Sequence, residues 1–202
     1  MVVLEKIAVK QLGRVEYDVA LKAMRAFTVQ RKEATPDELW LVEHPPVYTL
    51  GQGAREVAVS NGIPVVKSDR GGEITYHGPG QVVLYALIDL ARRGIKVKPF
   101  VALLEQSVID LIGPRAERKA GAPGVYVGGA KLAALGIRVT RGRSYHGLAL
   151  NVDMDLAPFS AIDPCGFPGL QVTQTKDIGM KKNRKEIEDL LAGFLIARIE
   201  NA

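Results

Sequence analysis

Eight apolar runs along the chain have the residue types and boundaries of β-strands. They are rich in β-branched and aromatic residues and are flanked by residues that favour turns. They cover residues 5–12, 38–44, 46–51, 63–69, 81–90, 124–129, 131–139 and 144–153. Strands are therefore predicted to dominate the middle of the chain.

Three other segments repeat apolar residues with the period of a helix, at residues 15–32, 99–112 and 184–199. Because the strands come in consecutive groups and do not alternate strictly with helices, we predict an α+β fold with a mixed, mostly antiparallel sheet flanked by helices. We expect one domain over residues 1–202, with a small C-terminal subdomain after about residue 151 as the alternative division.

Composition narrows the classes of function. The 202-residue chain carries a net charge of +5, which favours an acidic partner. Its basic residues are dispersed apart from a run at residues 181–185, which we interpret as a solvated helix start, and only 6% of residues are aromatic, which argues against nucleic-acid binding. The single cysteine, the start without a signal-peptide pattern and the lack of a long apolar run lead us to expect a cytoplasmic protein outside the membrane.

Residues 68–85 form the first stretch of unusual composition. Four glycines and a proline surround Thr75 and His77, so the backbone can turn sharply and approach a ligand closely. A glycine-rich hairpin is the simpler interpretation, but a hairpin needs fewer glycines, and Arg70 stands beside these two residues. We therefore interpret the stretch as a ligand-binding loop, which lacks the spacing of a phosphate-binding loop.

Two single residues are candidates for chemistry. Lys131 opens an otherwise apolar segment, where it either extends to solvent or is held desolvated, able to lose its proton or to favour the ionised form of a neighbouring acid. Cys165 lies in a loop rich in proline and glycine. An inert buried thiol is the common role of a lone cysteine, and a reactive thiol with a positive neighbour is the alternative.

Taken together, these stretches resemble the lipoyl(octanoyl) transferases of lipoate biosynthesis. The resemblance rests on five motifs in one order: EHPPVYTLG at 43–51, RGGEITYHGPGQ at 70–81, GGAKLAALGIRV at 128–139, HGLALNV at 146–152 and PCG at 164–166. It implies transfer of an octanoyl group from octanoyl acyl carrier protein to a lysine of a lipoyl-bearing domain through a thioester on the enzyme. The implied acceptors are lipoyl domains of 2-oxoacid dehydrogenases and the glycine cleavage H protein.

The resemblance also implies the site. It makes Cys165 the nucleophile and Lys131 its partner, with no metal and no cofactor. The substrate-binding residues that it implies are Arg70, Gly71, Gly72, Glu73, Ile74, Thr75, Tyr76, His77, Ala134, Leu135, Gly136, Gly147, Leu148 and Ala149. The implied fold is that of the catalytic domain of biotin and lipoate protein ligases, a mixed sheet flanked by helices with a smaller second sheet, and we expect a monomer.

In chemical terms, a nearby ammonium favours the thiolate, and a neutral Lys131 can take the proton of the attacking acceptor lysine. We expect His77 to orient or hydrogen-bond, with a purely structural role as the equal alternative, and His44 and His146 to be structural. Small residues suit a slot for the acyl chain, and basic residues suit docking of an acidic carrier. The docking candidates are Arg138, Arg141 and Arg143.

Three other functions stay open at this point. An ATP-dependent lipoate or octanoate ligase of the same fold would keep its activity in Cys165→Ala. A nucleic-acid-binding module would need clustered basic and aromatic residues. A cysteine hydrolase would need an essential histidine, from among His44, His77 and His146, and would not depend on Lys131.

Overall fold

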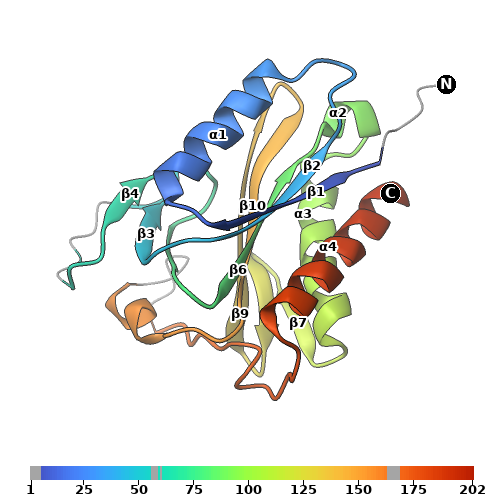
Figure 1. Ribbon diagram of the computed structural model, residues 1–202. Coiled ribbons are helices and arrows are strands. Elements are labelled where there is room, and N and C mark those ends of the chain that lie inside the picture. Colours follow the sequence, from blue (N-terminus) through green and yellow to red (C-terminus); the bar gives the residue numbers. More distant parts are fainter. Residues whose placement is uncertain (1–5, 56–58, 60, 163–168) are drawn as a thin grey trace.

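The computed structural model describes residues 6–55, 59, 61–162 and 169–202 (Figure 1). Its helices are α1 (Tyr17–Gln30), α2 (Leu90–Arg93), α3 (Val97–Ile112) and α4 (Arg184–Glu200), with a 3-10 helix, η1, at Ala157–Ala161. Its strands are β1 (Ala8–Arg14), β2 (Glu38–Glu43), β3 (Val47–Leu50), β4 (Val65–Lys67), β5 (Ile74–His77), β6 (Gln81–Leu87), β7 (Ala116–Lys119), β8 (Ala122–Val127), β9 (Ala130–Thr140) and β10 (Arg143–Asn151).

Seven strands form the main sheet in the order β1-β2-β6-β10-β9-β8-β7. Within this sheet, as far as the structure describes it, β1 and β2 pair parallel and the other neighbours pair antiparallel. A second sheet of three strands has the order β4-β3-β5. The predicted α+β class, with a mostly antiparallel mixed sheet and a smaller second sheet, is confirmed.

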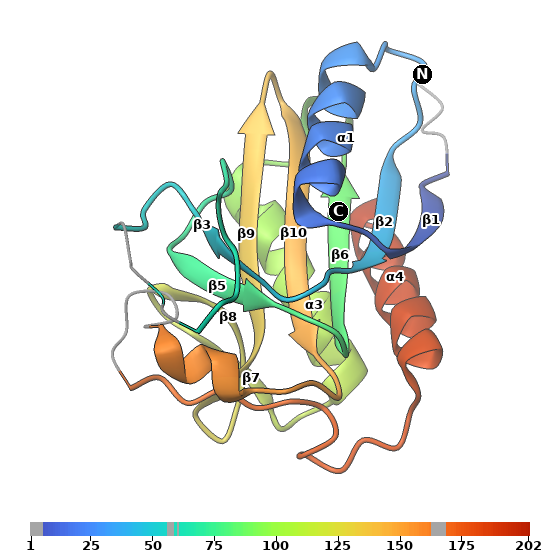
Figure 2. The same ribbon diagram turned by 60° about the vertical axis from the view of Figure 1, so that its left-hand side comes forward.

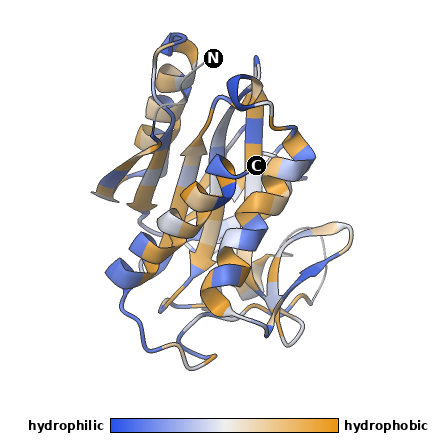
Figure 3. Ribbon diagram, turned by 90° about the vertical axis from the view of Figure 1, so that its right-hand side faces the viewer, coloured by the Kyte–Doolittle hydropathy of each residue, from blue (hydrophilic) through white to orange (hydrophobic). Residues whose placement is uncertain are grey.

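Different helices cover the two faces of the main sheet (Figure 2). Alternate residues of β6 divide between them: Val82 and Leu84 join the apolar cluster of α3 and α4, whereas Val83 and Tyr85 join that of α1. Because both faces are covered, the whole of β6 is buried and its sequence is almost continuously apolar. Figure 3 views the sheet from the side of α3 and α4, where these two helices lie next to each other.

Helix α4 begins at a capping box. The side chain of Asn183 accepts from the amide of Glu186, whose carboxylate accepts from the amide of Asn183. These two bonds satisfy backbone donors that a helix start leaves unpaired. The helix then buries Ile187, Leu191 and Leu195 in the same cluster as α3 and the main sheet.

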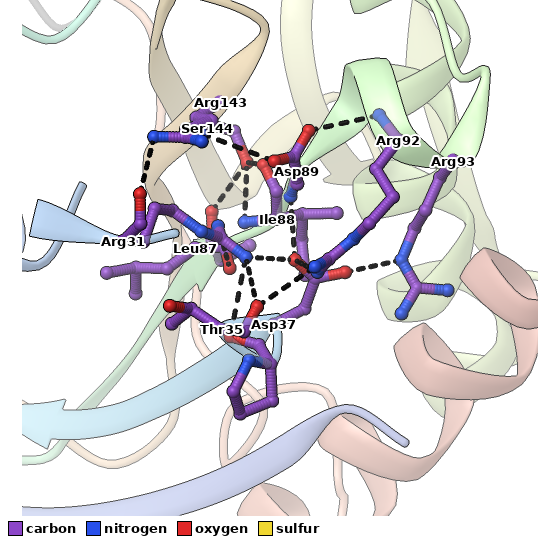
Figure 4. A network of polar contacts seen from close by, with 12 residues as sticks. Arg31, Thr35, Asp37, Leu87, Ile88, Asp89, Arg92, Arg93, Arg143 and Ser144 are labelled. Atoms are coloured by element: carbon purple, nitrogen blue, oxygen red, sulfur yellow. Dashed lines mark hydrogen bonds and ion pairs between the residues drawn. The ribbon is translucent and has the colours of Figure 1, made fainter. Parts of the chain in front are cut away.

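A buried ion cluster ties together the ends of α1, β2 and α2 (Figure 4). The carboxylate of Asp37 accepts from Arg31 (2.5 Å), Arg92 (2.8 Å) and Arg93 (2.5 Å), and also from the backbone amide of Asp89. Burial alone would raise the pKa of Asp37, but these donors outweigh it and hold the pKa below its ordinary value. The cluster lies at the end of the sheet where β10 begins.

Candidate active site

A pocket lies between the two sheets, on the face of the main sheet that α1 covers. Strands β5, β6, β9 and β10 and the first turn of α1 provide its walls. The lining residues are Tyr17, Arg70, Gly72, Glu73, Ile74, Thr75, His77, Val83, Tyr85, Ala134, Leu135, Gly136, His146, Gly147, Leu148 and Ala149. Three segments that the resemblance selected thus meet at one cavity.

Strand register explains the meeting of two of these segments. In the antiparallel pair of β9 and β10, Ala134 lies opposite Ala149, and Gly136 lies opposite Gly147. The segment that contains Arg70 reaches the same place because the amide of Gly71 donates to the carbonyl of Ile137 (2.9 Å). A Cβ on Gly136 would lie 2.7 Å from the carbonyl oxygen of Gly71, so this close approach requires glycine.

Arg70 holds this segment from within. Its Nε and Nη2 donate to Oγ1 of Thr49 (3.1 and 2.9 Å), and Nη2 also donates to the Thr49 carbonyl (2.6 Å). The arginine is buried, with only 8% of its surface exposed. Arg70 is thus anchored to β3, and its segment is fixed as one wall of the pocket.

Not every predicted binding residue reaches this pocket. Gly71 lines a second cavity, which shares Gly72, Glu73, Leu135 and Gly136 with the first. Tyr76 packs elsewhere: its ring centre lies 5.5 Å from that of Tyr48 and 5.5 Å from that of Phe159.

Lys131 is held in a defined position near these cavities. Only 3% of its surface is exposed, its Nζ donates to the carbonyl of Pro123 (3.1 Å), and the same atom lies 5.3 Å from the centre of the Tyr126 ring. Gly124 provides the space, since a Cβ there would lie 2.7 Å from Cε of Lys131. Pro123 lines the second cavity, so the Lys131 amine is bonded to a residue in the wall of that cavity.

Cys165 lies outside the described residues, so its position stays a prediction. The described chain resumes at Gly169, and the segment that follows forms a short parallel bridge with Lys131. The amide of Lys131 donates to the carbonyl of Gln171 (2.8 Å), and the amide of Thr173 donates to the carbonyl of Lys131 (2.9 Å). Residues six and eight positions after the cysteine in sequence are therefore hydrogen-bonded to the lysine backbone.

Two histidines pack together beside the pocket. Nδ1 of His77 donates to Oε1 of Gln81 (2.7 Å), and its ring stacks on Tyr17 with the ring centres 5.9 Å apart. Burial lowers the pKa of His77 to about 3, so its imidazole is neutral at physiological pH. His44 lies between the carbonyl of Val15 and the hydroxyl of Tyr85, both at 2.6 Å, and burial lowers its pKa as well.

His146 lines the pocket, although its sequence context gave it only a structural role. Its Nε2 donates to Asp69 (2.8 Å), and Tyr145 and Arg25 donate to the same carboxylate. Burial alone would raise the pKa of Asp69, but these donors hold it well below its ordinary value. Burial lowers the pKa of His146 despite this partner, and its φ of 60° is unusual for a residue other than glycine.

Sequence reasoning also missed Tyr17, Val83 and Tyr85 as pocket residues. All three lie on strands or helices that were predicted, and the period of two along β6 places Val83 and Tyr85 on one face. Which face meets the second sheet depends on tertiary structure, so no local signal identified them.

The fold has relatives among solved structures. A lipoate-protein ligase A bound with ATP superposes with a TM-score of 0.74 at 16% identity, over 97% of this chain and 86% of that one. A biotin protein ligase from Aquifex aeolicus in complex with biotin and ATP gives a TM-score of 0.58 at 9% identity, over 98% and 70%. The family model of the lipoyl protein ligase A/B catalytic domain matches residues 16–194. Fold and family match together define a catalytic domain of the lipoyl protein ligase class.

Sequence relatives give the particular family. An octanoyltransferase from Dechloromonas aromatica is 56% identical over 197 residues, covering 95% of this chain and 96% of the relative. One from Azoarcus sp. is 62% identical over 194 residues, covering 93% and 86%. The chain belongs to the octanoyltransferases, which are acyltransferases of lipoate biosynthesis, and the resemblance read from the five motifs is confirmed.

Proposed function

We propose that this octanoyltransferase takes its acyl group from octanoyl acyl carrier protein and passes it to a lysine of lipoyl domains, by way of a thioester on Cys165. One observation carries the proposal: three separated motif segments line one pocket, and Lys131 is bridged to the segment that follows the cysteine. The acceptors would be the lipoyl domains of 2-oxoacid dehydrogenases and the glycine cleavage H protein, in the cytoplasm, where a single cysteine stays reduced.

The pocket suits a short saturated chain. Its walls include Val83, Ala134 and Ala149, with glycine backbone between them. Burial of a methylene group is worth about 0.8 kcal/mol, so an octanoyl tail gains several kcal/mol in such a pocket. The polar residues Arg70 and Thr75 lie in the same lining and suit the end of the chain that carries the carbonyl.

The chemistry would run in two steps. The Cys165 thiolate, which the Lys131 ammonium favours, attacks the carbonyl of the carrier thioester, and a new thioester joins the acyl group to Cys165. The carrier sulfur leaves as a thiol with the proton of that ammonium, so Lys131 becomes neutral. The acceptor lysine, as its neutral amine, then attacks this thioester. The amide forms, the cysteine sulfur leaves, and Lys131 in its neutral form accepts the proton that the new amide nitrogen loses.

Docking of the acidic carrier would use the basic residues near the end of β9. Arg138 donates to Gln52 at the surface, and Arg141 is exposed at the turn before β10. Arg143 instead donates to Asp89 and to the carbonyl of Arg31, within the buried end of the sheet. Arg138 and Arg141 are therefore the better candidates of the three.

A reconstituted reaction tests the proposal. The enzyme is incubated with octanoyl acyl carrier protein and a lipoyl domain, without ATP, and the mass of the lipoyl domain is measured over time. We expect one octanoyl group to be added, and we expect Cys165→Ala and Lys131→Ala each to abolish the transfer. Transfer only from free octanoate with ATP would instead assign the chain to the ligases, as would full activity of Cys165→Ala.

A further inference from the structure

Two buried amide side chains join the pocket to the lysine segment. Gln81 on β6 and Asn151 on β10 lie opposite each other in the sheet, with 2% and 4% of their surfaces exposed. Nε2 of Gln81 donates to Oδ1 of Asn151 (3.0 Å), and Nδ2 of Asn151 donates to the carbonyl of Thr173 (3.0 Å). Thr173 is the residue whose amide donates to the carbonyl of Lys131.

The same line of hydrogen bonds continues from Gln81 to the pocket. Oε1 of Gln81 lies 2.7 Å from Nδ1 of His77, and Nε2 of His77 lies 3.5 Å from Oγ1 of Thr49. Oγ1 of Thr49 in turn accepts from Arg70, which anchors the pocket wall. We call this set of residues, Arg70, Thr49, His77, Gln81, Asn151 and Thr173, the polar relay.

The two ends of the polar relay fix the direction of every bond in it. The Thr173 carbonyl can only accept, so the amide nitrogen of Asn151 must face it and the oxygen of Asn151 must face Gln81. Gln81 therefore donates to Asn151 and presents its oxygen to His77, whose Nδ1 must carry the proton. Arg70 can only donate, so the Thr49 hydroxyl is left to donate to Nε2 of His77.

We propose that Gln81 and Asn151 are positioning residues, which hold the segment bonded to Lys131 in register with the acyl pocket. This inference rests on the proposed role of Lys131. Asn151 supplies the side-chain donor that fixes Thr173, and Thr173 fixes the backbone of the lysine. Both amides are buried, so a partner that loses its hydrogen bond to one of them cannot bond to water in its place. The segment that contains Thr173 would shift to find another partner.

The polar relay also assigns His77. Its Nδ1 donates to Gln81 (2.7 Å), and its Nε2 faces the Thr49 hydroxyl at 3.5 Å inside the relay. Its low pKa agrees with a neutral ring. His77 is therefore a further positioning residue, which links Thr49 to Gln81, and the proposed general base remains Lys131.

Histidine tautomers test the direction of the relay without any substrate. The chain has three histidines, so ¹⁵N-labelled histidine gives three ring systems in a long-range ¹H–¹⁵N spectrum. We expect the proton on Nδ1 in His77 and in His44, which faces the carbonyl of Val15, and on Nε2 in His146, which faces Asp69. A proton on Nε2 of His77, or a charged ring near neutral pH, would overturn the inference.

Kinetics test the positioning role. Asn151→Asp keeps the shape and the oxygen that faces Gln81 but replaces the donor to Thr173 by an acceptor. We expect kcat to fall by about 10- to 100-fold, with the KM for octanoyl acyl carrier protein within about threefold of wild type, because a small displacement of a catalytic group slows the chemical step. The His77 tautomer should be unchanged, since its end of the relay stays intact.

Gln174→Glu is the matched control. Gln174 is a buried amide on the same segment and outside the relay: its Oε1 accepts from the amide of Met154, and its Nε2 donates to Asp177 (3.2 Å), so Gln174→Glu also removes a side-chain donor. We expect Gln174→Glu to leave kcat within about twofold of wild type, because it leaves every bond of the relay intact. If Asn151→Asp does not fold, Gln81→Glu, which breaks the relay in its middle, should show the same loss of kcat. Wild-type kcat in either relay variant would refute the positioning role. A wild-type enzyme that transfers no octanoyl group would instead refute the proposed function and leave the tautomers as predicted.

Discussion

Ala149→Val should shorten the acyl chain that the enzyme prefers. Ala149 lines the pocket opposite Ala134, and it pairs with Val83 on the neighbouring strand. It is 3% exposed and belongs to the apolar cluster on the α1 face, so its side chain faces the side of the sheet that holds the pocket. Valine adds two carbon atoms there, about the volume of two methylene groups of the substrate.

The magnitude follows from burial. Burial of two methylene groups is worth about 0.8 kcal/mol each, or about 1.6 kcal/mol together. The wild-type enzyme should therefore prefer octanoyl over hexanoyl by roughly 15-fold in kcat/KM. In Ala149→Val the last two carbons of the octanoyl chain lose their place, so we expect the two substrates to react about equally. The assay is competition between octanoyl and hexanoyl acyl carrier protein, read from the mass of the lipoyl domain.

A matched control separates this effect from general destabilisation. Ala192→Val makes the same change on α4, at a residue that is 3% exposed in the cluster on the other side of the main sheet. We expect it to lower stability without altering the ratio of octanoyl to hexanoyl transfer. If Ala149→Val kept the wild-type ratio, or if Ala192→Val changed it equally, the assignment of this pocket to the acyl chain would be refuted.

Three further predictions concern the lysine and the stability of the fold. Gly124→Ala places a methyl group 2.7 Å from Cε of Lys131 and 2.8 Å from the carbonyl oxygen of Ala133, so both must shift. We expect a loss of at least about tenfold in kcat with the fold retained by circular dichroism, and wild-type kcat would contradict the position of the lysine. Asp37→Asn leaves buried arginines without their anion and should lower the free energy of unfolding, measured by urea denaturation, by about 3–5 kcal/mol. Asp110→Asn removes a partly exposed ion pair and should lower it by at most about 1 kcal/mol. Burial lowers the pKa of His77 to about 3, so between about pH 6.5 and pH 3 the unfolded chain binds a proton at this residue that the folded chain does not. The contribution of His77 to the free energy of unfolding should therefore fall by up to about 1.4 kcal/mol per pH unit on acidification through this range. A pH dependence unchanged in His77→Gln would contradict that last prediction.

The regular elements were predictable where one period governs a segment. The three long helices and strands β6, β9 and β10 follow the apolar pattern, because each buries one or both faces in the core. Two strands were missed for identifiable reasons. Strand β5 lies between glycines and was interpreted as part of a ligand-binding loop, and β7, with the sequence AERK, is a mostly exposed edge strand without an apolar pattern.

Much of the candidate site was predictable from motifs, but its geometry was not. Motif resemblance selected Ala134–Gly136 and Gly147–Ala149, and only the pairing of β9 with β10 shows that they are direct neighbours. The donor from Asn151 to Thr173, and the bond from Gln81 to Asn151, depend on register between segments far apart in the chain. No local pattern contains that information.

One measurement tests the central claim, that the acyl group passes through Cys165 beside Lys131. Wild-type enzyme is mixed with octanoyl acyl carrier protein in the absence of a lipoyl domain, and the intact protein is weighed and then mapped by peptide. We predict one octanoyl group per chain, located on Cys165, absent in Cys165→Ala and strongly reduced in Lys131→Ala. An octanoyl adduct that persists in Cys165→Ala, or that forms at the wild-type rate in Lys131→Ala, would contradict the account.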